Sequence, residues 1–215
     1  SWTALSPRDT SYSAALALMR STTIEEALVA GEDFLAPAQN LTIATADRIA
    51  LQTVGAMPRR NAQHQSQGRL PSPGWRMENR WQGRAPYAQN PSFVDPKGGI
   101  LGNTNNKLLD RPFPLHVSYA WADTQRIERW RRLMQAREVH TRESFIEAQL
   151  DTVSLTARTL LPLIAADLWF TGEAAPEGTP ARQRRRALDL LANWNGEMNE
   201  HLPEPMIYAA WLRAL

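Results

Sequence analysis

The chain of 215 residues has no cysteine. That absence excludes disulfides, thiolate metal sites and a cysteine nucleophile, and it leaves the redox compartment undetermined. No apolar run approaches the roughly 20 residues that a membrane-spanning helix requires, and no signal peptide is visible at the first residues. The formal net charge is only +2, so the overall charge does not indicate nucleic-acid binding. From these absences we expect neither a membrane nor a nucleic acid among the partners.

Patterns that bind metals or phosphates are missing as well. No histidine stands four residues from another, the spacing by which a helix presents two metal ligands, and there is no glycine-rich loop of the Walker type. We therefore expect each histidine to be a surface or structural residue, and we expect no cofactor and no metal ligand in this segment. The histidines are His64, His116, His140 and His201.

Basic residues gather in one short run near the end of the chain. At helical spacing this run is typical of a solvated helix face opposite Leu188, Leu191 and Trp194. A nucleic-acid patch is the alternative, but phosphate binding usually involves a broader basic surface. The arginines of the run are Arg182, Arg184, Arg185 and Arg186.

The composition is that of an ordinary globular chain, with 43% hydrophobic and 21% charged residues. We expect a mixed helix-and-strand part over residues 1–110 and a mainly helical part of the same domain over residues 111–215. The chain opens directly on SWTAL and closes on the helical pattern MIYAAWLRAL without a C-cap. We therefore interpret it as a segment that is truncated at both ends.

Capping and alternation patterns predict the first elements. Ser11 is a candidate N-cap for a short helix, and Thr23 with Glu26 forms a capping-box pattern for a second helix. β-Branched residues on both sides of Asp47-Arg48 predict a hairpin over residues 40–54.

Proline and glycine recur through residues 55–90, which predicts a long irregular tract of a kind that is usually functional. A strand is expected after it, over the sequence GGILGNTNN of residues 98–106. Asparagine is poor in strand interiors, and a buried amide costs free energy unless it is hydrogen-bonded. The asparagines at the end of this segment therefore indicate either a turn or a functional site.

The rest of the chain is predicted to be helical. Apolar residues recur on one face of each segment, and cap signals or proline mark the boundaries. The boundaries are set by Asp123 as an N-cap, Thr141 as a helix start, Pro162 as a kink or break in TLLPLIAADLW, the pair Thr179-Pro180 as N-cap and N1, and Met206 as the start of a last helix that runs to Leu215.

Ser1 is a candidate nucleophile, because a terminal serine can use its own α-amino group as the base. Such a residue should lead a strand, whereas SWTALSPRD runs quickly into Pro7 and a helix. We therefore expect that Ser1 is simply where this segment begins.

An ordered set of glycines, prolines and tryptophans extends from residue 55 to residue 106. It follows the order G-x-x-P-x-R, a proline-rich stretch, W-x-G-x-x-P, an N-P-x-x-G pattern and a final Asn-Asn pair. This order resembles the penicillin acylase (penicillin amidase) family. The residues that carry it are Gly55, Pro58, Arg60, Gly68, Pro71, Gly74, Trp81, Gly83, Pro86, Pro91, Asp95, Pro96, Gly98, Ile100, Asn105 and Asn106, with Asp95 in place of the usual Asn.

Other segments resemble the family in the same order, so the resemblance spans nearly the whole chain. SWTAL resembles the family's R-W-T-A-L, and LANWNG resembles L-x-x-W-D-G. Gln39-Asn40 resembles the start of the family's hairpin, although this hairpin is slightly shorter and Thr45 stands where Asp is usual. The helix pattern Q-x-D-x-x-S is matched by Gln149, Asp151 and Ser154.

The resemblance implies an α+β chain that is part of an N-terminal nucleophile hydrolase of αββα architecture, with a hairpin and an irregular loop tract followed by a helical C-terminal region. In such enzymes a precursor, or zymogen, is cleaved into α and β chains, and the new β-chain N-terminus is the serine nucleophile. That β chain starts with Ser-Asn-x-Trp, which SWTAL does not match. The resemblance therefore identifies this chain as an internal fragment of the β chain, with the nucleophile upstream of Ser1.

The implied substrate is a small-molecule linear amide, either the acyl side chain of a β-lactam such as penicillin or an N-acyl-homoserine lactone. The isolated chain is expected to be inactive, and its partners are the remaining α-chain and β-chain segments of the same precursor. The resemblance also implies a periplasmic or secreted enzyme. It leaves calcium open for the full enzyme, with ligands mostly from outside this segment.

One catalytic position is carried over from the family. The first Asn of the Asn-Asn pair donates its side-chain amide to the oxyanion hole, and here that residue is Asn105; the alternative is that Asn105 only closes a turn. Family members commonly place an Arg four residues before an Ile, but here that position before Ile127 is Asp123. Either Arg126 or an upstream residue supplies the charge, or the site is altered. A non-catalytic helical binding module on a degenerate acylase scaffold is the alternative that this departure and the shorter hairpin support.

Overall fold

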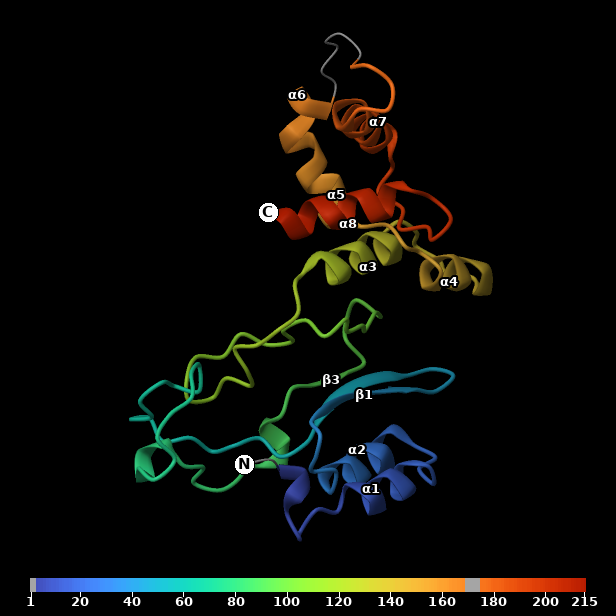
Figure 1. Cartoon of the computed structure of the whole chain (residues 1–215). Coiled ribbons are helices and arrows are strands. Elements are labelled where there is room, and N and C mark those ends of the chain that lie inside the picture. Colours follow the sequence, from blue (N-terminus) through green and yellow to red (C-terminus); the bar gives the residue numbers. More distant parts are fainter. Residues whose placement is uncertain (1–2, 169–174) are drawn as a thin grey trace. The chain divides into compact units, whose positions relative to one another are not determined.

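The computed structural model describes residues 3–168 and 175–215, and the chain divides into two compact units, Ser1–Ala122 and Asp123–Leu215 (Figure 1). The first unit combines short helices, a small sheet and long loops, whereas the second is built mainly from helices. The hairpin and the asparagine-rich segment with the predicted catalytic residue Asn105 both belong to the first unit.

The first unit begins with a short 3-10 helix, η1 (Thr3–Leu5), followed by α1 (Ser11–Leu18) and α2 (Ile24–Glu32). Thr23 caps α2 as predicted, since its Oγ1 accepts a hydrogen bond from the Glu26 N–H at 3.1 Å. The prediction that Ser11 is an N-cap is wrong. The Ser11 side chain is buried and its Oγ instead accepts hydrogen bonds from the N–H groups of Leu35 and Ala36, each at 2.8 Å.

The sheet has three antiparallel strands in the order β1-β2-β3: β1 (Gln39–Ala44), β2 (Ile49–Val54) and β3 (Ser92–Val94). The predicted hairpin is confirmed, with six residue pairs in register from Gln39↔Val54 to Ala44↔Ile49. The central strand β2 is buried from residue 50 to residue 54, because it is paired on both sides and also contacts α2. This strand is therefore the buried centre of the small sheet.

Residues 98–106 do not form the predicted strand. The chain leaves β3 at Asp95, whose φ is 45°, and then turns so that the Gly99 N–H donates to the Pro96 carbonyl at 2.8 Å. Left-handed backbone at Asp95 and Gly99 is incompatible with an extended strand. The tract before β3 is irregular, as predicted, and contains the 3-10 helices η2 (Met77–Asn79) and η3 (Tyr87–Gln89).

The second unit contains helices, as predicted: α3 (Gln125–Gln135), α4 (Arg142–Gln149), α5 (Leu155–Leu160), η4 (Leu161–Ile164), α6 (Ala165–Leu168), α7 (Pro180–Asn193) and α8 (Glu204–Ala214). Thr141 caps α4 in a capping box with Ser144, and Thr179 caps α7 with Pro180 in the first turn. Pro162 falls in η4, where the helix changes from α to 3-10.

Asp123 does not cap α3, which corrects that prediction. The N-cap position is Thr124, and its side chain makes no capping hydrogen bond. The Asp123 carboxylate instead accepts a hydrogen bond from Nε2 of Gln125 at 3.4 Å. Asp123 stands one residue too early for its carboxylate to reach the free N–H groups of the first turn.

The core of the second unit forms where α5, η4, α6, α7 and α8 meet. Its buried residues are Ala157, Leu161, Leu168, Leu191 and Tyr208, and Leu188 and Trp194 pack against them. This placement confirms the prediction that α7 turns its leucines inward. Arg182, Arg184 and Arg186 are exposed on the helix, and Arg185 pairs with Asp189 at 3.0 Å.

Candidate active site

The predicted catalytic residue Asn105 lies in a loop that is held by asparagine side chains. Its own backbone has φ 66°, in the left-handed region that Asn tolerates better than most residues. The Asn105 N–H donates to Oδ1 of Asn103 at 3.0 Å, which is an Asx-turn. The turn leaves Asn105 exposed, while the next residue, Asn106, is buried at 8% exposure.

Asn106 fixes the inner side of this loop. Its Oδ1 accepts a hydrogen bond from the Thr104 N–H at 3.0 Å, and its Nδ2 donates to the Lys107 carbonyl at 3.2 Å. Nδ2 of Asn103 also donates to the Asn106 carbonyl at 3.3 Å. The buried amide is therefore satisfied, and the two neighbouring asparagines have different surroundings.

The loop is tied to the sheet through Asn40. Nδ2 of Asn40 donates to Oδ1 of Asn103 at 3.0 Å, and Oδ1 of Asn40 accepts from Oγ1 of Thr53 at 2.9 Å. Asn40 and Thr53 are partners in the β1–β2 register. The position of Asn105 is therefore linked through two side chains to the buried strand β2.

Thr53 also forms hydrogen bonds with the Asn90-Pro91 segment. Its N–H donates to the Pro91 carbonyl at 2.8 Å, and its carbonyl accepts from Nδ2 of Asn90 at 3.0 Å. One residue of β2 thus connects the asparagine loop with the Asn90-Pro91 segment. Such satisfied networks hold a unique geometry, because an unpaired buried polar group is costly.

His116 is the most buried of the four histidines, with 5% of its surface exposed. Its ring stacks on Tyr119 with centroids 4.2 Å apart, and the Arg69 guanidinium lies 4.6 Å from the centre of the Tyr119 ring. Burial lowers the pKa of His116, and the nearby cations Arg60 and Arg69 lower it further. A neutral, stacked imidazole agrees with the predicted structural role.

The other candidates from the sequence lie in different parts of the chain. Ser1 lies outside the described residues. Asp123 and Arg126 belong to the second unit, whereas Asn105 belongs to the first. In the Q-x-D-x-x-S pattern, Asp151 pairs with Arg129 and Ser154 caps α5, so both act within the second unit.

Calcium is bound by six to eight oxygen ligands, often from several carboxylates. Within residues 3–168 and 175–215 no group of three or more His, Asp or Glu side chains converges in a way that could hold a metal ion. The side chains in these ranges therefore do not by themselves fit a calcium site.

The role of Asn103 as the acceptor at the centre of the loop was not predicted from the sequence. A local signal was present, because the spacing Asn103-Thr104-Asn105 is typical of an Asx-turn. The bond from Asn40 had no local signal, since it joins two segments that are 63 positions apart.

The fold is similar to that of a solved penicillin acylase. The solved structure of a thermostable penicillin G acylase from Alcaligenes faecalis matches it with a TM-score of 0.63, over 87% of this chain and 32% of that chain, at 19% sequence identity. The family model described as penicillin amidase matches residues 1–215. The chain therefore belongs to the penicillin amidase family, which confirms the resemblance seen in the order of the motifs.

Curated relatives agree with this placement. The chain is 32% identical to the acyl-homoserine lactone acylase QuiP of Pseudomonas aeruginosa over 200 residues, which are 91% of this chain and 23% of that protein. It is 30% identical to QuiP of Pseudomonas putida over 95% of this chain and 25% of that protein. It is 30% identical to the penicillin acylase 2 proenzyme of Pseudomonas sp. over 75% of this chain and 19% of that protein. The chain thus spans about a quarter of the length of the relatives QuiP that it matches.

Proposed function

We propose that this chain is part of an amidohydrolase that cleaves linear amides with an N-terminal serine located outside the chain. Its relatives are named as acyl-homoserine lactone acylases and as a penicillin acylase proenzyme, all hydrolases of amide bonds. The proenzyme name supports a cleaved precursor, and the small share of each relative that the chain covers supports a catalytic centre completed by other segments. On this proposal the isolated 215-residue chain is inactive.

The substrate proposed is an N-acyl-homoserine lactone or the acyl side chain of a β-lactam such as penicillin. The serine Oγ attacks the amide carbonyl carbon, and the serine α-amine accepts the hydroxyl proton. The carbonyl oxygen becomes an oxyanion, which needs a fixed hydrogen-bond donor. We assign that donor to Nδ2 of Asn105. Collapse of the intermediate breaks the C–N bond, the α-ammonium returns the proton to the leaving nitrogen, and the amine departs from an acyl-enzyme ester. Water, deprotonated by the α-amine, then attacks the ester carbonyl and releases the carboxylic acid and the free serine.

The observation that carries this role is the fixed and exposed position of Asn105. The loop reaches the surface at this residue, and its backbone is held by Asn103, which is held in turn by Asn40 of β1. A donor that is already oriented stabilises developing charge without reorganisation. An amide that only closed a turn would not require a bond from a distant strand.

The non-catalytic binding module is the weaker proposal. It rests on Asp123 and on the shorter hairpin, but the β1–β2 pairing is complete over six residue pairs. Asn40 is paired with Thr53 within this ladder, so the strand that supports Asn105 is formed.

The proposed enzyme is periplasmic or secreted, and its partners are the amide substrate and the other α-chain and β-chain segments of the precursor. Among the helices described, none has the length and the apolar character to cross a membrane.

The decisive experiment is Asn105→Gly in the intact precursor, assayed with N-acyl-homoserine lactones and with penicillin G. Glycine accepts φ 66° without a steric penalty, so this variant removes the amide and keeps the loop conformation. We expect kcat to fall by roughly 10²–10³ with a smaller change in KM. Lys107→Ala, an exposed neighbour, is the matched control. Turnover by Asn105→Gly within a few-fold of the control contradicts the oxyanion assignment.

A further inference from the structure

The first unit has a pocket of about 390 Å³ along the irregular tract, and Asn105 is not among the residues that line it. Its lining comes from three segments around residues 57–60, 85–91 and 111–117. One wall includes Asn90 and Pro91, the segment that Thr53 holds against β2. This volume lies within the range of small-molecule sites in proteins.

The charge of this pocket is unbalanced. Arg59, Arg60 and Arg111 line it, and no carboxylate does. Within the described parts of the chain none of the three arginines forms an ion pair. Asp110, the sequence neighbour of Arg111, is exposed and pairs with Lys107. The cations that face the pocket are therefore not neutralised by the protein around it.

Arg60 is the arginine of this pocket whose charge is least hydrated. Its side chain is partly buried, and burial lowers the pKa of Arg60 because a charged guanidinium loses hydration there. Its Nη1 donates to the His116 carbonyl at 3.2 Å, and the described residues engage none of its other N–H donors. A partly buried guanidinium with unused N–H donors attracts an anion more strongly than a fully solvated guanidinium does.

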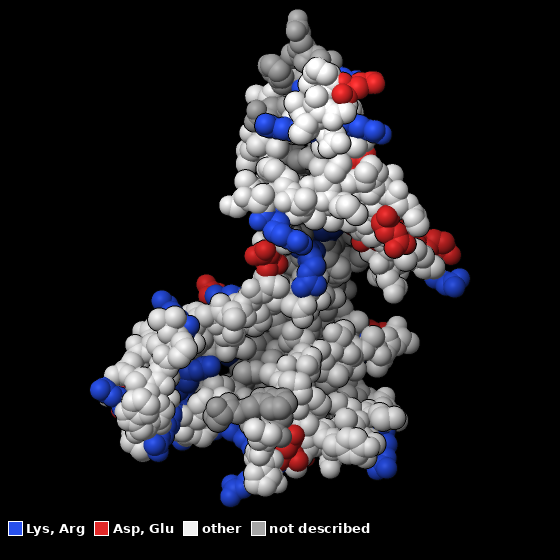
Figure 2. Space-filling model, viewed as in Figure 1, with Lys and Arg blue, Asp and Glu red and all other residues white. Residues whose placement is uncertain are grey.

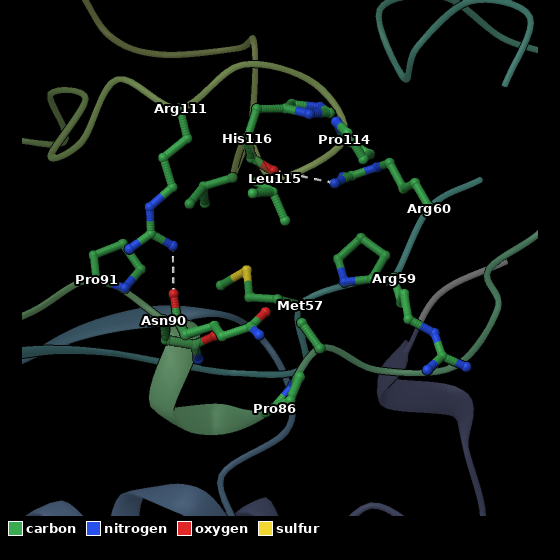
Figure 3. A pocket seen from close by; sticks show the side chains of 14 residues that line it. Met57, Arg59, Arg60, Pro86, Asn90, Pro91, Arg111, Pro114, Leu115 and His116 are labelled. Carbon is green, nitrogen blue, oxygen red and sulfur yellow. Dashed lines mark hydrogen bonds between the residues drawn. The ribbon is translucent and has the colours of Figure 1, made fainter. Parts of the chain in front are cut away.

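Arg111 and Arg60 approach the pocket from opposite sides, with Met57 and Leu115 between them (Figure 3). Arg111 donates to the Gln89 carbonyl and is thereby held at its side of the pocket. Arg59 differs, because its guanidinium is turned toward the Gln82 carbonyl and points away from Met57 (Figure 3). The guanidinium of Arg60 therefore lies toward the pocket, whereas that of its sequence neighbour Arg59 is directed away from it (Figure 3).

Apart from Gln89, Asn90 and His116, the rest of the lining is apolar. Pro58, Pro86, Pro91 and Pro114 contribute rings with few rotatable bonds, and Met57 supplies an adaptable side chain. Apolar walls with a few convergent polar groups are typical of small-molecule sites. They match a ligand that has both an apolar body and a negative charge.

We propose that this pocket binds a small organic carboxylate, with its carboxylate on Arg60 and its apolar body against Met57 and the prolines. Guanidinium and carboxylate match in a bidentate geometry. An amidohydrolase also releases a carboxylic acid, which is ionised at neutral pH, so the ligand class is the class of its acyl product. The proposal itself rests on the pocket and does not depend on turnover.

The test uses NMR of protein labelled with ¹³C at the methionine methyl groups, with the Met57 signal assigned from Met57→Leu. The probe is hexanoate, and hexan-1-ol is the uncharged control with the same chain length. We expect hexanoate to shift the Met57 signal in a saturable way. Hexan-1-ol should reach half of its maximal shift only at a concentration at least about tenfold higher. No saturable shift up to about 20 mM hexanoate, or equal shifts from both compounds, overturns the proposal.

Two adjacent variants test the assignment to Arg60. Arg60→Gln should weaken hexanoate binding by about tenfold or more, whereas Arg59→Gln, with the same loss of charge, should change it less than about twofold. Arg111→Gln provides a second variant on the opposite wall and should also weaken binding. Equal effects at Arg59 and Arg60 mean that only the general charge matters, which contradicts a built site. Because the readout is binding, an inactive Asn105→Gly enzyme still reports on this pocket.

Discussion

Nδ2 of Asn40 donates a hydrogen bond to Oδ1 of Asn103 at 3.0 Å, across 63 positions of the sequence. The same oxygen accepts the N–H of Asn105 at 3.0 Å. Strand β1 thereby orients the turn that presents Asn105. The bond thus joins a residue of the hairpin motif to a residue of the asparagine-rich segment.

We predict that Asn40→Ala in the intact precursor lowers kcat by about 10-fold to 100-fold and leaves KM nearly unchanged. The loss of the donor frees Asn103, and small displacements of a catalytic group have effects of this size. Thr42→Ala, an exposed residue two positions along the same strand, is the control. If Asn40→Ala lowers the unfolding midpoint but keeps the kcat of the control, Asn40 does not position Asn105.

Ser11→Ala should destabilise the protein by about 2–4 kcal/mol, because two N–H groups, of Leu35 and Ala36, lose their acceptor in a buried place. Ser13 lies on the same helix and is exposed, so Ser13→Ala should change the free energy of unfolding by less than about 0.5 kcal/mol. Urea unfolding of both variants measures the difference. Equal midpoints for the two variants show that the Ser11 hydroxyl is dispensable.

His116 should make the folded state sensitive to acid. Its pKa in the folded state is below the ordinary value of about 6.5. Below about pH 6.5 the unfolded state therefore binds more protons than the folded state, and stability falls as the pH decreases toward the folded pKa. Above about pH 6.5 the residue is neutral in both states and contributes no pH dependence.

The measurement is the urea midpoint of wild type and His116→Phe between about pH 7.5 and pH 5. The phenyl ring keeps the stacking on Tyr119, so the variant should lose less stability on acidification than the wild type. His201 is exposed, and His201→Gln should follow the wild-type profile. A His116→Phe profile parallel to the wild type rules out His116 as the source.

Asp151→Asn should destabilise the second unit by about 1–3 kcal/mol, because Arg129 then loses its carboxylate in a place where both side chains are mostly buried, at 22% and 13% exposure. The control is Glu147→Gln, which breaks the exposed pair with Arg137 and should cost about 0.5 kcal/mol or less. Thermal unfolding of the two variants compares them directly.

The same ion pair has a defined pH dependence. The hydrogen bonds from Arg129 hold the pKa of Asp151 below its ordinary value. The stabilisation is therefore complete above about pH 4 and is lost as the pH falls through the lowered folded pKa. Asp151→Asn should remove this acid-dependent loss, and a loss that persists unchanged in the variant assigns it to another carboxylate.

Much of the fold is determined by local sequence. Thr23, Thr141 and Thr179 cap their helices as predicted, and Pro162 falls where the helix changes type. These signals act between residues three or four positions apart, so the chain contains all the information within one turn. The order of the motifs also sufficed to place the chain in its family, whereas the catalytic role of Asn105 stays a prediction.

The tertiary structure alone decided which groups the polar side chains bind. Ser11 has the local pattern of an N-cap, yet its hydroxyl serves the N–H groups of residues that are 24 and 25 positions away. The segment of residues 98–106 has apolar residues typical of a strand, yet it forms a loop held by Asn40. Hydrogen-bond partners at such separations depend on how the sheet and loops pack, and a buried polar group takes whichever partner that packing brings within reach.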